Sequence, residues 1–217
     1  MRLTANNSYF SPASMISTWL SILDIYGDKA PLTESRYKSA REAYITSLFC
    51  LGLQKQTGVH YWLRATLDGS TPDSIIISFH SIHEMSKIEI LPLEIFEWEQ
   101  HSKIDLFEAI KNKLRNKNYP PNYILLCYCH GRTDETDLSD VAARLQSLEI
   151  SVCEIWFLAN ILNNLHEFDF HGLAKLYPTR HEIYFNAIAE FEATLKQPQM
   201  LIQEGKFAYH AINLKKA

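Results

Sequence analysis

The 217-residue sequence predicts an α/β domain, in which a mixed β-sheet is flanked by helices. One observation is a helical hydrophobic period followed by three short β-rich segments; another is a later alternation of helical and strand patterns. The expected order is helix, three strands, helix, strand, helix, strand. These elements are expected at 34–56, 60–67, 73–79, 87–98, 104–117, 123–129, 138–148 and 151–158.

Residues 1–35 are expected to form an N-terminal helical extension. Within 14–26, Met15, Trp19 and Ile22 recur at helical spacing, and Gly27 follows the last turn. A helix this short is marginal in isolation, so it must dock on the main body or on another subunit.

The helix expected at 34–56 presents one apolar stripe that includes Tyr44 and Leu48, and Gly58 provides its stop signal. Glu42 lies beside this stripe. The three β-rich segments that follow have short connections, one of them carrying the turn signal Asp68-Gly69. Short connections favour an antiparallel meander.

In the second half of the core, the spacing of hydrophobic residues alternates between a helical and a strand pattern. Leu106, Ile110 and Leu114 mark an amphipathic helix, and the next helix is expected to be capped by Asp137 or Thr136. The strands expected at 123–129 and 151–158 are nearly continuous apolar runs, which is typical of strands buried on both faces. Such alternation predicts right-handed crossovers between neighbouring strands.

The last third of the chain, 160–217, is expected to be a helical region packed on the core. Residues 160–177 are irregular in pattern, whereas 179–195 spaces Ile183, Ala187 and Phe191 as a helix. The predicted regions are therefore 1–35, 36–159 and 160–217.

The net charge and the cysteines limit the functions that the sequence is compatible with. The formal charge of -4 and pI near 6.1 argue against autonomous tight binding to nucleic acid, although a local basic groove stays compatible. Cys50, Cys127, Cys129 and Cys153 lie in apolar runs, as reduced core thiols of a cytosolic protein do, and this spacing is unusual for zinc. A cytoplasmic protein without a membrane partner is expected.

One acidic residue opens the second β-rich segment, and another lies within the third. Pro72-Asp73 opens the second segment, and Glu94 lies inside the third. Adjacent strands can bring two such carboxylates together, where they could share a divalent metal. Hard cations such as Mg²⁺ or Mn²⁺ prefer these oxygen ligands.

This order of elements, with Pro72-Asp73 opening one strand and Glu94 in the next, resembles the PD-(D/E)xK superfamily, the restriction-endonuclease-like fold. The resemblance covers roughly 34–159 and implies metal-dependent cleavage of a phosphodiester. It implies that Asp73 and Glu94 are catalytic and hold the metal, and that Glu42 is an accessory catalytic acid on the first helix. If active, the protein would be a Mg²⁺- or Mn²⁺-dependent endonuclease.

The motif of that superfamily places a lysine two residues after the second acid, and this sequence has Phe96 there. Three interpretations follow. The lysine has migrated to another element, for which Lys38, Lys55, Lys87 and Lys103 are candidates; or the domain is catalytically degenerate and retained for nucleic-acid binding or assembly; or Asp73 is a strand-opening turn residue and Glu94 a solvated one.

The favoured function is a nuclease-fold protein with a degenerate metal-dependent phosphodiesterase site. It would bind DNA or RNA, or act as a subunit of a DNA-processing or defence complex, with a protein partner or a second copy of itself. The expected nucleic-acid contacts are the basic residues of one helix, Lys111, Lys113, Arg115 and Lys117. The alternative is a protein–protein interaction module, which predicts an exposed apolar patch instead.

Overall fold

Helix α3 (Lys38–Thr57) is the longest helix of the chain's described part and organises the first of two structural units. The computed structural model describes residues 8–66, 71–82, 85–99, 102–130, 136–161, 170–204 and 208–212. Unit 1 comprises Met1–Ile90 with Ile188–Ala217, and unit 2 comprises Leu91–Ala187. The expected Asp68-Gly69 turn lies outside the described residues.

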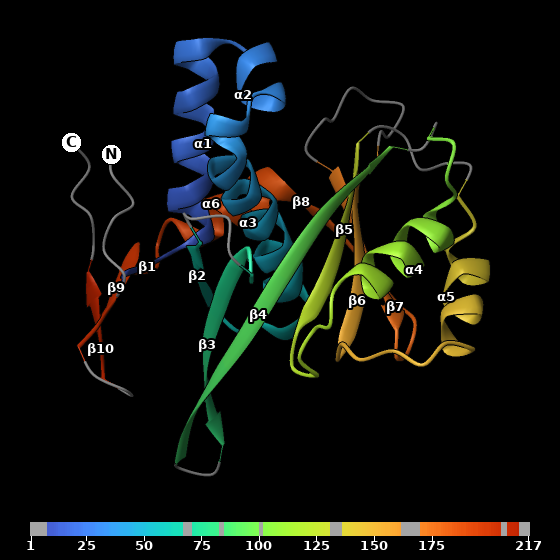
Figure 1. Cartoon of the computed structure of the whole chain (residues 1–217). Helices are drawn as coiled ribbons and strands as arrows, with labels where there is room; N and C mark the ends of the chain where they lie inside the picture. Colours follow the sequence, from blue (N-terminus) through green and yellow to red (C-terminus); the bar gives the residue numbers. More distant parts are fainter. Residues whose placement is uncertain are drawn as a thin grey trace. The chain divides into compact units, whose positions relative to one another are not determined.

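Unit 1 combines β-strands with the helices α1, α2 and α3 and most of α6 (Figure 1). Its elements are β1 (Ser8–Phe10), α1 (Pro12–Tyr26), α2 (Lys29–Thr33), the 3₁₀ turn η1 (Ser35–Tyr37), α3, β2 (Tyr61–Ala65), β3 (Ser74–Ile82), the first residues of β4 (Met85–Glu99), most of α6 (Ala187–Thr194), β9 (Met200–Gln203) and β10 (Tyr209–Ile212).

The strands of unit 1 run in the order β10-β9-β1-β2-β3. Strands β2 and β3 are antiparallel, with Leu63 opposite Ile76, as the short connection predicted. Helix α3 packs on β2 and β3. Helix α1 packs on α3 in turn, and the Trp19 ring stacks on Tyr44 at 5.6 Å between centroids. The N-terminal helix is therefore docked, as its short length required.

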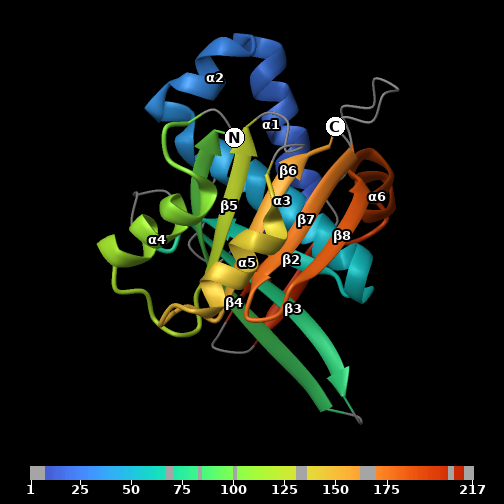
Figure 2. The same cartoon turned by 90° about the vertical axis from the view of Figure 1, so that its right-hand side faces the viewer.

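Unit 2 is a sheet with two helices on one face (Figure 2). Strands β4, β5 (Ile124–His130) and β6 (Glu154–Asn160) are parallel, and β7 (Phe170–Tyr177) and β8 (His181–Asn186) continue antiparallel. Helices α4 (Leu106–Asn116) and α5 (Leu138–Gln146) cover the face that carries Cys127, Phe157 and Ala174. The parallel crossovers predicted from the alternating pattern are confirmed.

The described residues thus form an α/β fold with six α-helices and a mixed sheet of ten strands, ordered β10-β9-β1-β2-β3-β4-β5-β6-β7-β8. The predicted α/β class is confirmed at this level. The predicted regional boundaries after residues 35 and 159 stay predictions. In the part of the chain that the structure describes, no helix is long and apolar enough to cross a bilayer.

The predicted helix over 179–195 is wrong in its first half. Residues 181–186 form β8, and only Ala187–Thr194 is helical. The buried side chains of β8, Ile183 and Phe185, alternate with exposed ones, and this period of two is the signature of a half-buried strand. Strand β7 occupies much of the stretch expected to be irregular. The expected C-terminal helical tail is therefore mainly β structure, with one short helix.

The cysteines behave as the sequence predicted. Cys127 and Cys129 are buried on β5, and neither is in a disulfide. Burial raises the pKa of the Cys127 thiol well above its usual range, so this thiol stays protonated. Cys153 donates its S–H to the Tyr123 carbonyl at 3.1 Å. These are the properties of small apolar core residues.

We predict that Trp19→Ala lowers the free energy of unfolding by about 3–5 kcal/mol, because it leaves a cavity where α1 packs on α3. Denaturant unfolding monitored by circular dichroism measures this loss. Ile25→Ser, on the same helix but 71% exposed, is the matched control and should change stability by about 0.5 kcal/mol or less. Equal effects of both substitutions would contradict the docking of α1.

Candidate functional site

Glu42 and Asp73, two of the predicted site residues, come together in unit 1. Glu42 lies in the first half of α3, and Asp73 immediately precedes β3. Their exposed fractions are 6% and 7%. One turn after Glu42, the Thr46 hydroxyl donates to Ser74 Oγ at 2.9 Å and holds the helix against the start of β3. Two carboxylates far apart in sequence are thereby buried near enough for the Asp73 charge to act on Glu42.

The electrostatics of this pair are unfavourable without a cation. Burial raises the pKa of Glu42, and the nearby Asp73 carboxylate raises it further. Lys38 and Arg41 oppose both effects, and Nζ of Lys38 lies 3.2 Å from Glu42 Oε1, although the Lys38 side chain is 54% exposed. Glu42 therefore resists ionisation, and a further positive charge nearby would stabilise its ionised form.

The pair fits a weakly held Mg²⁺ or Mn²⁺ rather than a closed structural metal site. Among the described residues, no group of three or more His, Cys, Asp or Glu side chains could hold a metal ion. Mg²⁺, however, commonly takes one or two protein carboxylates and keeps several waters. Glu42 and Asp73 supply that number of carboxylates.

Glu94 lies on β4 in unit 2 and is 1% exposed. Its Oε1 atom accepts from Lys117 Nζ at 2.7 Å and from the Tyr119 hydroxyl at 3.3 Å, and Lys113 Nζ lies 3.0 Å away. Across the residues that the structure describes, the buried Oε2 atom of Glu94 has no hydrogen-bond partner. The interpretation of Glu94 as a solvated strand residue is wrong.

Helix α4 explains how the lysines reach Glu94. It begins at the N-cap Asp105, whose carboxylate accepts from the backbone N–H of Glu108 at 2.7 Å. It then returns antiparallel to β4, because it connects two parallel strands. Its last turn therefore lies near Glu94, at the start of the stretch where β4 pairs with β5.

Lys113 and Lys117 were predicted to contact nucleic acid and not to pair with an acidic side chain. Phe96 occupies the position where the motif expects lysine, and it packs against the core of unit 2. The crossover geometry, together with lysines late in the helix, is the signal that could have located them. Of the four lysines considered for migration, Lys38 pairs with Glu42 and Lys55 pairs with Glu190 at 3.1 Å.

The other basic residues predicted to contact nucleic acid lie on the same helix. Lys111 pairs with Glu108 at 2.8 Å, and Arg115 stands in the last turn. Phosphate contacts by these residues stay a prediction. So does a metal shared by Asp73 and Glu94, which belong to unit 1 and unit 2 respectively.

Ser78, His80 and Glu89 form a polar cluster in unit 1 with the residue types of an acyl-transfer triad. His80 Nε2 lies 3.0 Å from Ser78 Oγ and 3.2 Å from Glu89 Oε2, so both partners meet the same ring nitrogen. A catalytic triad uses the two ring nitrogens separately. Ser78 is also fully buried, so its hydroxyl is closed to substrate. The cluster is a structural network.

Comparison with known proteins adds no relative to this picture. No protein-family model, no curated protein and no solved structure matches the chain.

We predict that Lys113→Met with Lys117→Met lowers the free energy of unfolding by about 2–4 kcal/mol, because Glu94 would keep a buried charge without a cation. Lys111→Met, which breaks a pair with the more exposed Glu108, should cost about 1 kcal/mol or less. Adding Glu94→Gln to the double variant should restore most of the loss in urea unfolding. Failure of that rescue would show that the lysines do not act through Glu94.

A second prediction concerns pH. The folded-state pKa of Glu42 is raised above its ordinary value of 4.5, so the folded state binds more protons there and stability falls as pH rises through this window. Glu42→Gln removes the penalty, so the variant should gain stability relative to wild type between pH 4 and pH 7. Thermal unfolding across this range measures the difference, with Asp24→Asn, which removes an exposed carboxyl, as reference. If the stability difference between Glu42→Gln and wild type did not change with pH, the raised pKa of Glu42 would be contradicted.

Proposed function

We propose that this protein is a nuclease-fold protein that holds a divalent cation, Mg²⁺ or Mn²⁺, at Glu42 and Asp73. The single observation that carries the proposal is the burial of these two carboxylates near each other, where burial and the Asp73 charge raise the pKa of Glu42. A bound cation would polarise a phosphate and lower the pKa of an attacking water.

The order of elements supports a restriction-endonuclease-like architecture for the core. That architecture, in the resemblance, is a helix, three strands, a helix and a strand. The chain provides α3, β2, β3, β4, α4 and β5 in this order, with β2 and β3 antiparallel and β4 and β5 parallel. Asp73 opens the second of these strands and Glu94 lies on the third.

The surroundings of Glu94 support a degenerate rather than a complete catalytic centre. Phe96 carries neither charge nor donor at the lysine position. Lys113 and Lys117 supply positive charge from α4 instead, and they already neutralise Glu94. We therefore place the protein among degenerate members of such a fold, retained for binding nucleic acid or as a subunit of a DNA-processing or defence complex.

Calorimetric titration with Mn²⁺ tests the cation site. Wild type should bind Mn²⁺ saturably, and Asp73→Asn should weaken binding at least tenfold, because one of two ligands loses its charge (about 1.4 kcal/mol per tenfold). Asp24→Asn removes an exposed carboxylate of the same unit and should leave binding unchanged.

Absence of Mn²⁺ binding at millimolar concentration would refute the proposal. Binding that is equal in wild type and Asp73→Asn would move the cation elsewhere. If binding is confirmed, incubation with single- and double-stranded DNA and RNA in Mn²⁺ then separates an active nuclease from a degenerate one.

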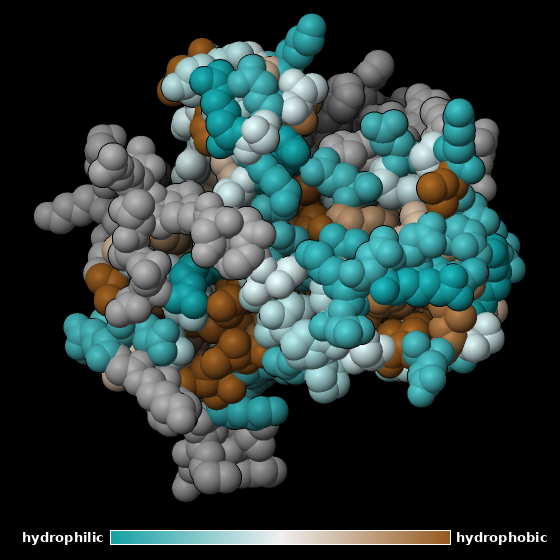
Figure 3. Space-filling model, viewed as in Figure 1, coloured by the Kyte–Doolittle hydropathy of each residue, from teal (hydrophilic) through white to brown (hydrophobic). Residues whose placement is uncertain are grey.

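A second candidate function, a protein–protein interaction module, is favoured by one surface. Four of the exposed large apolar residues belong to the consecutive helices α1 and α2, and Figure 3 shows brown side chains among teal ones there. They are Leu20, Ile25, Tyr26 and Leu32, with exposed fractions of 50%, 71%, 54% and 48%. Exposed apolar residues on one element are typical of interaction sites. Absence of Mn²⁺ binding would favour this second candidate function.

A further inference from the structure

Two lysine ammonium groups of unit 2 converge on a single carboxylate oxygen. Nζ of Lys117 lies 2.7 Å from Oε1 of Glu94, and Nζ of Lys113 lies 3.0 Å from the same atom. The Tyr119 hydroxyl donates to this oxygen as well, at 3.3 Å. Lys113 is in the last turn of α4, Lys117 is its C-cap residue, and Tyr119 follows. Three donors from the end of one helix therefore meet at one point.

This cluster carries more positive than negative charge. Lys113 and Lys117 face one glutamate, so one positive charge is left unbalanced, whereas Lys111 on the same helix is matched by a single acid, Glu108. The other oxygen of Glu94, Oε2, is buried and has no hydrogen-bond partner among the described residues. Two ammonium groups this close repel each other, and an anion beside them would relieve the repulsion.

The cluster also has more hydrogen-bond donors than its acceptor can use. Each lysine ammonium has three N–H groups, whereas a carboxylate oxygen has two lone pairs. Oε1 of Glu94 is already contacted by both lysines and by the Tyr119 hydroxyl. Most N–H groups of the two lysines therefore point to solvent or to a ligand.

The lysines are accessible from outside, although the acid between them is not. The side chain of Lys117 is 46% exposed and that of Lys113 is 24% exposed, whereas only 2% of the Glu94 side chain is exposed. Tyr119, whose ring centroid lies 6.0 Å from Nζ of Lys117, is buried. The buried side chains thus contact the ammonium groups on their inner side, and the outer side faces solvent.

A phosphate group matches this arrangement. Its oxygens carry negative charge and accept from several N–H donors at once, and lysine is a common phosphate ligand. Because Nζ of Lys113 and Nζ of Lys117 lie within 3.0 Å of the same oxygen, they are close enough to contact one phosphate together. The single surplus charge equals the charge of one phosphodiester.

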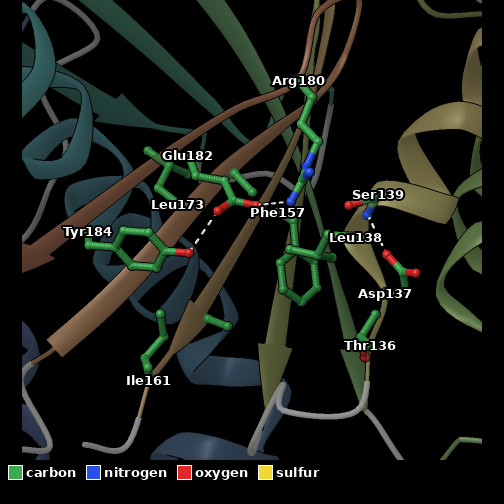
Figure 4. A pocket seen from close by; sticks show the side chains of 13 residues that line it. Thr136, Asp137, Leu138, Ser139, Phe157, Ile161, Leu173, Arg180, Glu182 and Tyr184 are labelled. Atoms are coloured by element: carbon green, nitrogen blue, oxygen red, sulfur yellow. Dashed lines mark hydrogen bonds and ion pairs between the residues drawn. The ribbon is translucent and has the colours of Figure 1, made fainter.

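The pocket of about 330 Å³ shown in Figure 4 is a poor site for the same ligand. It lies between the start of α5 and strands β6, β7 and β8, and Asp137 and Glu182 at its rim outweigh the single positive charge of Arg180. The Asp137 carboxylate also accepts from two backbone N–H groups at the start of α5, which would otherwise attract an anion. The surplus of positive charge is thus at the other end of the crossover helices, beside Glu94.

We propose that Lys113 and Lys117, paired on their inner side with Glu94, bind one phosphate group of a nucleic-acid backbone. The inference deepens the proposed function, because it rests on the binding of nucleic acid. It uses residues of unit 2 and is separate from the cation site at Glu42 and Asp73.

Fluorescence anisotropy of a labelled single-stranded oligodeoxythymidine dodecamer tests this site. The test variant combines Lys113→Met, Lys117→Met and Glu94→Gln, so it loses the surplus charge without keeping a buried acid that lacks a cation. It should bind the strand about tenfold more weakly or worse, because it loses hydrogen bonds between charged groups. The slope of log K against log salt concentration should become less steep by about 0.7, the value for one phosphate of a single strand.

Two single variants are matched controls. Lys103→Met, before the other end of α4, lowers the net charge by the same one unit as the test variant, and Lys111→Met removes the lysine that Glu108 balances. Both controls should bind the strand nearly as tightly as wild type. If Lys103→Met weakens binding as much as the test variant does, overall charge explains the binding and the proposal is overturned.

Inorganic phosphate distinguishes the source of the phosphate group, and NMR titration of the wild type with it needs no variant. If inorganic phosphate shifts the resonances of Lys113 and Lys117 but the strand does not bind, the lysines hold a free phosphate and the nucleic-acid source is overturned. Unchanged affinity for the strand in the test variant, or no binding of either ligand at millimolar concentration, overturns the site itself. The Mn²⁺ titration at Glu42 and Asp73 is unaffected by either result, so failure of this site and failure of the proposed cation site are distinguishable.

Discussion

The burial of Glu42 beside Asp73 is the constraint on which the account of unit 1 depends. Helix α3 must pack on β2 and β3 to bury its apolar face, and the hydrogen bond from Thr46 to Ser74 fixes how it does so. That packing forces two carboxylates out of water together. A fold rarely keeps such a pair for stability alone, since a like charge nearby disfavours ionisation of each partner. The cation that we propose at Glu42 and Asp73 would add to the stabilisation that Lys38 and Arg41 give.

Unit 2 also buries a carboxylate, Glu94, and neutralises it with lysine side chains. Glu94 is buried even more completely, but α4 returns along β4 and brings two lysines to it. Phe96 carries no charge, and the positive charge at Glu94 comes from Lys113 and Lys117 at the end of the crossover helix. Glu94 is thus neutralised by two lysines, whereas Glu42 pairs with Lys38, whose side chain is 54% exposed.

The sequence predicted the α/β class, α1 and the elements from α3 to β6, because those elements carry long and consistent hydrophobic periods. It did not predict the short elements β1, α2 and η1. It failed at β8, where Ile183, Ala187 and Phe191 suggest helical spacing although Ile183 and Phe185 alternate as a strand. The nearness of Glu42 and Asp73 was predictable from the resemblance. The pairing of Glu94 with Lys113 and Lys117 was not, because it depends on where the crossover helix ends in space. The neighbours of a residue across the sheet, such as Gly172 beside Ala159, depend on strand register, which a linear pattern does not reveal.

The most direct measurement of the central claim is the titration of the Glu42 carboxyl by ¹³C NMR with and without Mg²⁺. Without Mg²⁺, the carboxyl should titrate above the ordinary value of 4.5 for glutamate, because of burial and of Asp73. With saturating Mg²⁺ its midpoint should fall, because the cation and the proton compete for the same oxygens. A midpoint that Mg²⁺ leaves unchanged would contradict a cation site at Glu42 and Asp73.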